Sequence, residues 1–188
     1  MTRKQKPKLE SPFNWDYLIQ SGRVHRSLYV DPAIFELEQQ RIFGGTWVYL
    51  AHASELGETD SFITRRLGQR PIILTRDNDA QIHVLINRCT HRGAQVCRVP
   101  SGKAKYFTCG YHGWSFRNNG ECAGIPLDKA YGTNFDKSER NLSRVPYVAE
   151  YRGFIFATLN PAKGEKPLVD HLGPAAERMD EWIDHNGG

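Results

Sequence analysis

Two short motifs that combine cysteine and histidine lie close together in the chain. The first reads Cys89-Thr-His91 and the second Cys109-Gly-Tyr-His112, with seventeen residues between them. Thiolate sulfur and imidazole nitrogen are both ligands for borderline and soft transition metals. Each motif follows an apolar run typical of a β-strand, so each is expected in a loop at a strand end. Two such loops at the tips of neighbouring hairpins would bring four metal ligands together.

A set of two cysteines and two histidines fits two kinds of metal centre. One is tetrahedral zinc, whose structural sites usually pair cysteine with cysteine and histidine with histidine. The other is a Rieske [2Fe–2S] centre, in which two histidines replace two cysteines on one iron. Each motif here supplies one ligand of each type, which favours the dinuclear cluster. We expect Cys89 and Cys109 on one iron and His91 and His112 on the other, with zinc as the alternative.

The surrounding sequence predicts a mainly β protein. Short apolar runs separated by turn residues indicate a small antiparallel β domain over residues 45–160. Segments typical of tight turns are Arg76-Asp-Asn-Asp79 and Asn118-Asn-Gly120. Strands are expected at 47–50, 62–64, 71–75, 81–87, 105–108, 114–117, 145–148 and 153–159.

Helical segments are expected on both sides of this domain. Residues 1–44 would form a polar arm and a helix over 31–43, which Asp31 can cap and which has Pro32 in its first turn. Residues 161–188 would form a linker and a helix, because the composition of 160–167 is that of a linker and later apolar residues share a helical face.

Composition limits the class of protein. The 188 residues carry 25 Lys and Arg against 21 Asp and Glu, a net charge of +4. This mild charge, without interleaved aromatics, argues against nucleic acid as a partner. No apolar stretch reaches the ~20 residues that span a bilayer, and the basic residues 1–8 lack the apolar core of a secretory signal. We therefore expect a cytoplasmic protein without a membrane partner, in which Cys97 and Cys122 are free thiols.

The motifs resemble those of the N-terminal Rieske domain of bacterial aromatic-ring-hydroxylating oxygenase α subunits. The matching segments are Asn87-Arg-Cys-Thr-His-Arg-Gly93, Cys109-Gly-Tyr-His-Gly-Trp114 and Tyr151-Arg-Gly-Phe-Ile-Phe156, and the resemblance covers about residues 15–185. It implies that residues 161–188 begin a catalytic domain, whose mononuclear Fe(II) would lie on ligands beyond residue 188. No catalytic residue is therefore expected within this chain, and His171 and His185 are expected to be surface histidines.

Other residues of the two motifs are expected to support the cluster. Gly93 and Gly113 would let the backbone approach it and donate N–H groups to sulfur, with ordinary turn glycines as the alternative. Trp114 and Tyr111 would shield it, although simple core packing would look the same. Arg92 would close the ligand loop or face a partner, and a solvated arginine is the alternative.

The ligand set also predicts a reduction potential. Rieske centres span roughly −150 to +300 mV, above all-cysteine clusters. High-potential respiratory members carry a disulfide between their cluster loops, at positions that are Ala94 and Tyr111 here, and a serine where this chain has Trp114. We therefore expect a potential nearer the low end of that range, suited to accepting electrons from a ferredoxin or a reductase.

The resemblance implies the electron-transfer portion of an oxygenase of aromatic compound catabolism. Electrons from NAD(P)H would pass through a flavin reductase, with or without a ferredoxin, to this cluster. His91 and His112 would be the exit toward a mononuclear iron that activates O₂, in a neighbouring subunit of a homo-oligomer, commonly a trimer with or without β subunits. A freestanding Rieske ferredoxin is the alternative, but the helix and about 45 residues before the β domain favour the oxygenase.

Overall fold

The computed structural model describes residues 12–185, so most of the expected polar arm and the last three residues lie outside the described part. The contacts divide the chain into two compact units, residues 1–38 and 39–188. Each unit is described by itself.

The first unit consists of short helices and a two-stranded hairpin. Asn14 caps its first helix by accepting a hydrogen bond from the N–H of Tyr17, and Asp31 Oδ1 accepts from the N–H of Ala33 at 2.8 Å. The cap that the sequence predicts at Asp31 is therefore confirmed. The elements are α1 (Trp15–Leu18), β1 (Ile19–Gln20), β2 (Arg23–Val24), α2 (Ser27–Val30) and α3 (Pro32–Glu38).

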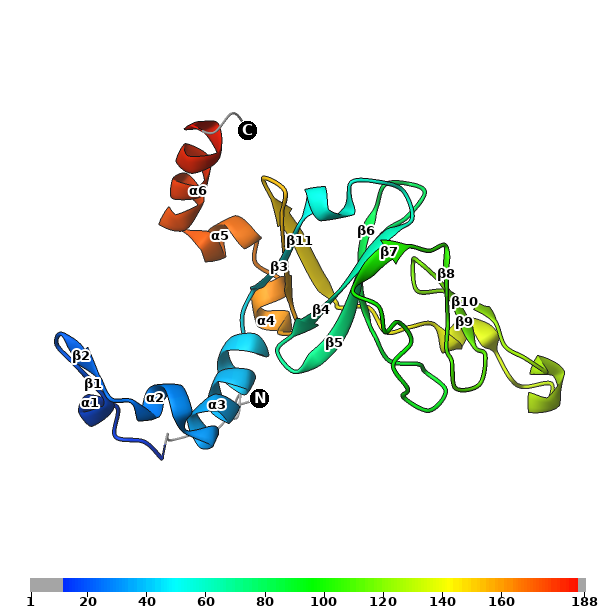
Figure 1. The fold of residues 1–188 in the computed structure, drawn as a ribbon, viewed down its shortest axis with the longest axis horizontal. Helices are drawn as coiled ribbons and strands as arrows, with labels where there is room; N and C mark the ends of the chain where they lie inside the picture. Colours follow the sequence, from blue (N-terminus) through cyan, green and yellow to red (C-terminus); the bar gives the residue numbers. More distant parts are fainter. Residues whose placement is uncertain (1–11, 186–188) are drawn as a thin grey trace, which may run out of the picture. The chain divides into compact units, whose positions relative to one another are not determined.

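The second unit begins with η1 (Gln39–Phe43), a π-helical turn that continues the helix expected over 31–43. Its strands form three antiparallel sheets, in the orders β11-β12-β3, β6-β5-β4-β7 and β10-β9-β8 (Figure 1). These strands are β3 (Val48–His52), β4 (Ser61–Leu67), β5 (Arg70–Arg76), β6 (Ile82–Ile86), β7 (Ser101–Lys103), β8 (Tyr106–Thr108), β9 (Ser115–Arg117), β10 (Cys122–Gly124), β11 (Tyr147–Tyr151) and β12 (Phe154–Thr158).

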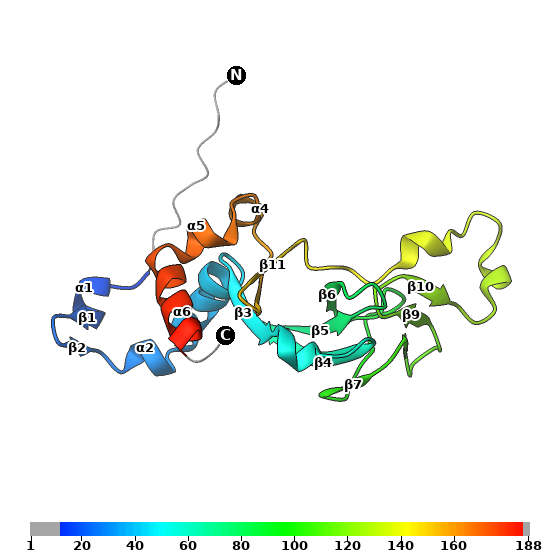
Figure 2. The ribbon, with the colours of Figure 1, turned by 90° about the horizontal axis from the view of Figure 1, so that it is seen from above.

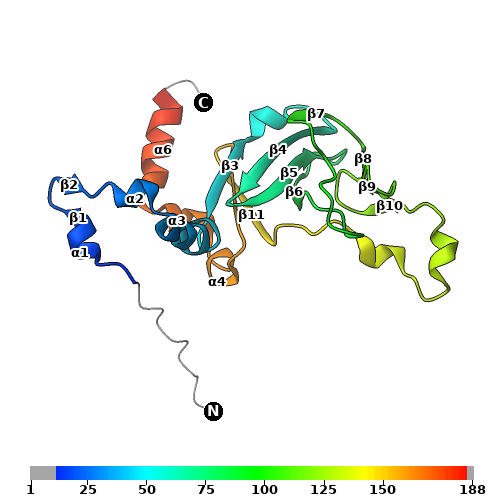
Figure 3. The same cartoon turned by 60° about the horizontal axis from the view of Figure 1, so that its bottom comes forward.

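The four-stranded sheet separates two apolar cores. Successive side chains of a strand point to opposite faces, and in β5 Ile73 belongs to one core while Ile72 and Leu74 belong to the other. Figure 3 shows β3 and β11 on one side of this sheet and β8–β10 on the other. The core that contains Ile73 also contains Cys89 and Cys109. One face of the sheet therefore packs against the core that contains the two predicted cysteine ligands.

The expected strands are all present, and the structure adds the β1–β2 hairpin of the first unit and two strands of the second, β7 and β10. β7 reads Ser-Gly-Lys and is exposed along its length, so it lacks the apolar alternation by which a strand is detected. β10 contains only three residues. Both turns expected between strands are formed, and Gly120 in the second has a φ of 92°, which suits glycine.

Short helices fill the connections and the C-terminal part of the second unit. A helical turn, α4, interrupts the expected linker, because Asn160 caps it and Pro161 starts it. The expected C-terminal helix is confirmed as α6, and none of the helices described over residues 12–185 is of a length and apolarity to traverse a bilayer. The helices are η2 (Ala53–Leu56), η3 (Asp128–Tyr131), η4 (Lys137–Arg140), α4 (Pro161–Gly164), α5 (Leu168–Leu172) and α6 (Pro174–His185).

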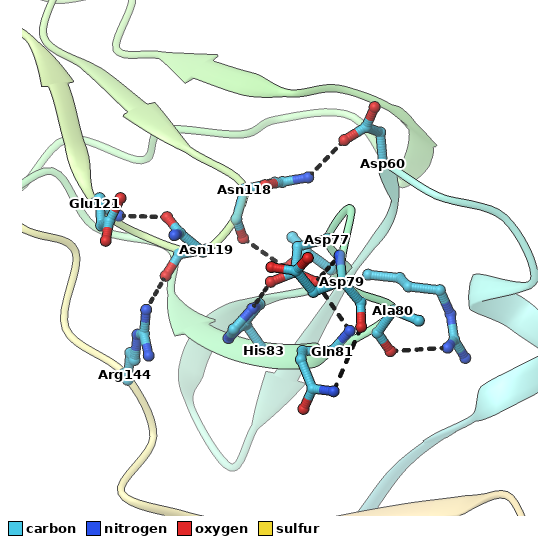
Figure 4. Close-up of polar contacts among 12 residues, drawn as sticks. Asp60, Asp77, Asp79, Ala80, Gln81, His83, Asn118, Asn119, Glu121 and Arg144 are labelled. Atoms are coloured by element: carbon cyan, nitrogen blue, oxygen red, sulfur yellow. Dashed lines mark hydrogen bonds and ion pairs between the residues drawn. The ribbon is translucent and has the colours of Figure 1, made fainter.

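A polar network ties together the two turns remote from the ligand loops (Figure 4). In the β5–β6 turn, Asp77 Oδ2 lies 2.6 Å from His83 Nε2. In the β9–β10 turn, Asn118 donates to Asp60 Oδ1 at 2.8 Å, and its carbonyl accepts from the Thr75 hydroxyl at 2.6 Å. The four-stranded sheet and the β8–β10 sheet are therefore held together at this end by side-chain hydrogen bonds.

Candidate metal centre

The two predicted ligand motifs form the same kind of turn. In each, the N–H of the cysteine donates to the carbonyl five residues later, and the N–H of the glycine four residues later donates back to the cysteine carbonyl. These bonds are 2.8 and 2.8 Å in the loop of Cys89, and 2.8 and 2.9 Å in the loop of Cys109. Gly93 and Gly113 have φ values of 75° and 73°. The structure therefore presents two matched loops, each offering a thiol and an imidazole.

The matched bonds correct one prediction. The N–H groups of Gly93 and Gly113 are taken by the cysteine carbonyls, so the prediction that they donate to sulfur is wrong. Around Cys89 that role falls to the backbone N–H groups of His91 and Arg92, which hydrogen-bond the sulfur. Each of these N–H groups closes a turn onto the carbonyl four residues earlier, and the positive φ of the glycine then redirects the chain that follows.

The two cysteines lie next to each other in the core. Cys89 is 3% exposed and Cys109 is 2% exposed, and the two thiols are within hydrogen-bonding reach. Burial raises the pKa of the Cys89 thiol and the Cys109 thiol raises it further, while the N–H groups of His91 and Arg92 lower it. Two adjacent buried sulfurs without a cation between them are poor at ionising. A bound metal would remove that penalty, because a coordinating thiol is deprotonated outright.

The two histidine rings also lie next to each other. The rings of His91 and His112 have centroids 4.6 Å apart and planes at 70°. Nδ1 of His91 is buried and has no hydrogen-bond partner, and burial followed by the charges of His112 and Arg92 lowers the pKa of this imidazole. A buried acceptor without a partner is costly, and a neutral imidazole nitrogen of this kind is a metal ligand. The donor set therefore fits a metal cluster.

Aromatic rings surround the histidines unequally. The indole of Trp114 is 3% exposed and stacks on His91, with centroids 4.7 Å apart and planes 7° apart. The ring of Tyr111 is 61% exposed, and its centroid lies 3.9 Å from that of His112. Trp114 thus covers one face of His91 within the core, whereas Tyr111 leaves His112 exposed to solvent.

A lobe over residues 126–140 forms a third side of the site, which the sequence patterns did not reveal. Figures 1 and 2 show this lobe extending from the end of β10 away from the four-stranded sheet. The ring centroids of Tyr131 and Phe135 each lie 6.2 Å from that of Trp114. The hydroxyl of Thr90 donates a hydrogen bond of 2.7 Å to the carbonyl of Arg140. The two aromatics four residues apart are the only signal that could have found it, because the lobe has no strand or long-helix pattern.

The remaining cysteines and histidines lie apart from this centre. Cys97 and Cys122 are buried free thiols, as expected, and burial raises the pKa of both. His171 and His185 are exposed and hydrogen-bond Thr46 and the Glu181 carbonyl respectively. Within residues 12–185, no three His, Cys, Asp or Glu side chains are grouped closely enough to hold one metal ion. In a dinuclear cluster with two cysteines on one iron and two histidines on the other, each iron needs only two protein ligands.

A small β domain with two matched Cys-and-His loops defines an iron–sulfur protein of the mixed-ligand type. Residues 46–151 match the Rieske [2Fe-2S] domain family, and the chain belongs to that family. A similar curated protein is the 2-halobenzoate 1,2-dioxygenase large subunit of Burkholderia cepacia, which is 38% identical over 170 residues, covering 88% of this chain and 36% of the relative.

Solved structures agree with this assignment. Naphthalene 1,2-dioxygenase from Rhodococcus sp., solved with indole bound, has 39% identity and a TM-score of 0.78, over 84% of this chain and 36% of that chain. A quaternary ammonium Rieske monooxygenase has 31% identity and a TM-score of 0.72, over 83% and 42%; its structure is described as giving insight into carnitine oxidation by gut microbiota and inter-subunit electron transfer. The chain thus spans little more than a third of the length of these relatives, and corresponds to the Rieske portion of oxygenase α subunits.

Proposed function

We propose that Cys89 and Cys109 hold one iron of a [2Fe–2S] cluster, and that His91 and His112 hold the other. The orphaned, buried Nδ1 of His91 is the observation that carries this assignment, since it lies in one of two matched loops and has no other partner. When bound, such a cluster supplies a one-electron relay. A zinc ion at the same residues would need three or four of these ligands around one point.

The chain's own residues divide the work at this site. The buried cysteines would keep one end of the site dry, and the N–H groups of His91 and Arg92 would stabilise charge on the Cys89 sulfur. Trp114 would hold the His91 ring in place by stacking. The exposed His112 would offer the edge at which electrons enter or leave. We therefore propose that Trp114 shields the cluster and that the exposed Tyr111 contacts a partner protein.

For the whole protein we propose the α subunit of a Rieske non-haem iron oxygenase that acts on aromatic compounds. The named dioxygenase relatives support this, and the alignment extends over segments outside the β domain, which fits this interpretation better than a freestanding ferredoxin. A mononuclear Fe(II) would be held outside this chain. The donor would be a flavin reductase or a ferredoxin, in the cytoplasm.

Assembly belongs to the same proposal. We expect a homo-oligomer, commonly a trimer, with or without β subunits, in which the edge of His91 and His112 faces the iron of a neighbouring subunit. The similar monooxygenase whose structure is described in terms of inter-subunit electron transfer supports this arrangement.

The cluster assignment is tested with iron and sulfide analysis and with electron paramagnetic resonance of the dithionite-reduced chain. We expect two irons and two sulfides per chain and a paramagnetic signal from the reduced cluster. Cys109→Ser should lose this signal, whereas Cys97→Ser, a change of another buried thiol outside both loops, should keep it. A colourless protein with one zinc would contradict the proposal.

The potential is a separate test of the electron donor. We expect a midpoint below about +100 mV, toward the low end of the Rieske range, because the chain has Ala94 and Tyr111 where high-potential members have a disulfide. A protein-film or dye-mediated titration measures it. A midpoint above about +100 mV would exclude a low-potential ferredoxin or flavin as the natural donor while leaving the cluster assignment intact.

A further inference from the structure

One positive charge lies at the contact between the lobe over residues 126–140 and the first ligand loop. Thr90, which stands between the proposed ligands Cys89 and His91, donates its hydroxyl to the carbonyl of Arg140 at 2.7 Å. This bond uses the backbone of Arg140 and leaves its side chain for other contacts. The last residue of the lobe is therefore fixed beside the residue that joins two of the proposed ligands.

The side chain of Arg140 packs against an aromatic ring of the lobe. Its Cζ lies 5.2 Å from the ring centroid of Phe135, within the range of about 6 Å for a cation–π contact. Its Nε is buried without a hydrogen-bond partner, and no carboxylate among the described residues forms an ion pair with it. Hydrogen bonds from Ser138, and to a smaller extent the charge of Arg140, lower the pKa of the exposed Asp136. This carboxylate is thus engaged by Ser138, and the guanidinium is held without an ion-pair partner.

The ring beneath this guanidinium connects it to the metal site. Phe135 packs against the core that contains Cys89 and Cys109, and its ring centroid lies 6.2 Å from that of Trp114. Trp114 in turn stacks on His91, with centroids 4.7 Å apart. Apolar groups screen a charge far less than water does. A cation packed on these rings therefore acts on the site more strongly than a cation in solvent at the same distance.

Other basic residues near the ligands differ from Arg140 in their exposure. Arg88 and Arg92 of the first ligand loop are exposed, and so is Lys129 of the lobe, whereas Arg140 is half-buried. Salt screens exposed charges beyond about 10 Å at about 0.1 M ionic strength, and partly buried charges much less. Arg140 therefore combines a position against the first ligand loop with limited screening.

We propose that Arg140 tunes the reduction potential of the cluster, by holding a positive charge that favours the reduced form. This inference rests on the proposed function, because it requires a [2Fe–2S] cluster on the two loops. Two ferric irons, two sulfides and two thiolates are formally neutral together, and one added electron gives a net negative charge. A fixed cation stabilises that negative charge and so raises the potential. Thr90 and Phe135 are positioning residues for Arg140.

The test compares the midpoint potentials of the cluster-loaded chain and its variants. R140Q removes the charge and keeps the backbone carbonyl that Thr90 binds. The equilibrium constant for reduction should fall about 3- to 30-fold, the range expected from Coulomb's law for one partly buried charge. This fall lowers the midpoint by about 30 to 90 mV, at about 59 mV per tenfold for one electron. R140K keeps a cation that can also lie over a ring, so it should recover more than half of the shift.

The matched control is K129Q, which removes the same charge from an exposed side chain of the same lobe. Its midpoint should stay within about 20 mV of the unmodified chain, a twofold change. The R140Q shift should persist in about 0.5 M salt, because the charge is partly buried. The sign separates charge from structure. A lobe that had merely come loose would admit water, which stabilises the charged reduced form and raises the midpoint instead.

Three results would overturn the proposal: an R140Q midpoint that is unchanged or higher, an R140K midpoint as low as that of R140Q, or equal shifts in R140Q and K129Q. If R140Q fails to hold iron and sulfide, R140M, which keeps much of the aliphatic stem, is measured in its place. Loss of the cluster from both would assign Arg140 a structural role and also overturn the proposal. Absence of iron and sulfide from the unmodified chain would instead contradict the proposed function.

Discussion

At the scale of single residues, the ligand loops depend on glycines that no other residue replaces without strain. Gly93 and Gly113 have φ values of 75° and 73°, a region in which an L side chain costs of order 1–3 kcal/mol. Their N–H groups close the loops onto the cysteine carbonyls. The strain of a replacement would fall on the turns that present Cys89 and Cys109.

We therefore expect Gly113→Ala to lower the free energy of unfolding by about 1–2 kcal/mol. Its Cβ would meet Pro126 Cγ at 3.0 Å, and a proline ring cannot move away easily. Gly93→Ala should cost less, because its Cβ meets only the mobile end of Arg88. Urea unfolding measures both.

The control is Gly110→Ala, in the same loop as Gly113 but without a positive φ and with nothing within 4 Å of a new Cβ. It should leave the unfolding free energy within about 0.5 kcal/mol of the unmodified chain. Equal losses of unfolding free energy in Gly110→Ala and Gly113→Ala would show that the positive φ of Gly113 is not what makes its replacement destabilising.

At the scale of elements, the site is held between two anchored ends of the β unit. One end carries the ligand loops and the lobe, joined by the bond from Thr90 to the Arg140 carbonyl. The other end carries the network of Asp77, His83 and Asn118 (Figure 4). Because β6 runs from this network to the first ligand loop, loosening the network would loosen the strand that positions Cys89.

The network predicts a pH dependence of stability. Burial alone would raise the pKa of Asp77, but hydrogen bonds from His83, Gln81 and Asp79 outweigh it and lower the pKa below the usual value. A carboxyl with a lowered folded-state pKa stabilises the fold above the unfolded-state pKa of about 4, and this stabilisation is lost as the pH falls through the folded-state pKa.

Asp77→Asn should accordingly lower the unfolding free energy by about 1–2 kcal/mol at pH 7. The difference between variant and unmodified chain should shrink as the pH falls below about 4. Urea titrations at several pH values measure this, and Asp79→Asn, which leaves the His83 contact intact, is the control. A difference that stays constant down to pH 2 would show that the ionised form of Asp77 is not what stabilises the turn.

At the scale of the whole molecule, metal binding and folding of the second unit are coupled. The four proposed ligands lie on two loops that are separated by seventeen residues and share one core. Any group that binds the folded state alone stabilises that state. The buried thiols and the orphaned Nδ1 of His91 are costly as long as they lack a metal.

Removal of the cluster should therefore destabilise the second unit. We expect the chain after treatment with a chelator and a reductant to unfold at a lower temperature than the loaded chain, by ten degrees or more if the metal contributes several kcal/mol. Differential scanning calorimetry measures both forms. In hydrogen exchange, the loops of Cys89 and Cys109 should lose protection first, and the β1–β2 hairpin of the first unit should be unaffected. Equal melting temperatures would contradict the coupling.

The sequence by itself determined the chemical identity of the site and the class of fold. Ligand type and spacing are local properties, so the two motifs could be found without coordinates, and strands with an apolar alternation were predicted for the same reason. The exposed β7 and the three-residue β10 were not predicted, because neither has a periodic pattern of apolar residues.

Only the tertiary structure decided the contacts between residues distant in the chain and the hydrogen bonds that depend on backbone conformation. It brought the ring centroids of His91 and His112 to within 4.6 Å of each other and packed the 126–140 lobe against Trp114. It also overturned the expected bonds from Gly93 and Gly113 to sulfur, since the folded loops bring both N–H groups onto the carbonyls of Cys89 and Cys109. Composition fixes which charges and donors exist, but hydrogen-bond pairing is settled by distance and direction, which only the folded chain supplies.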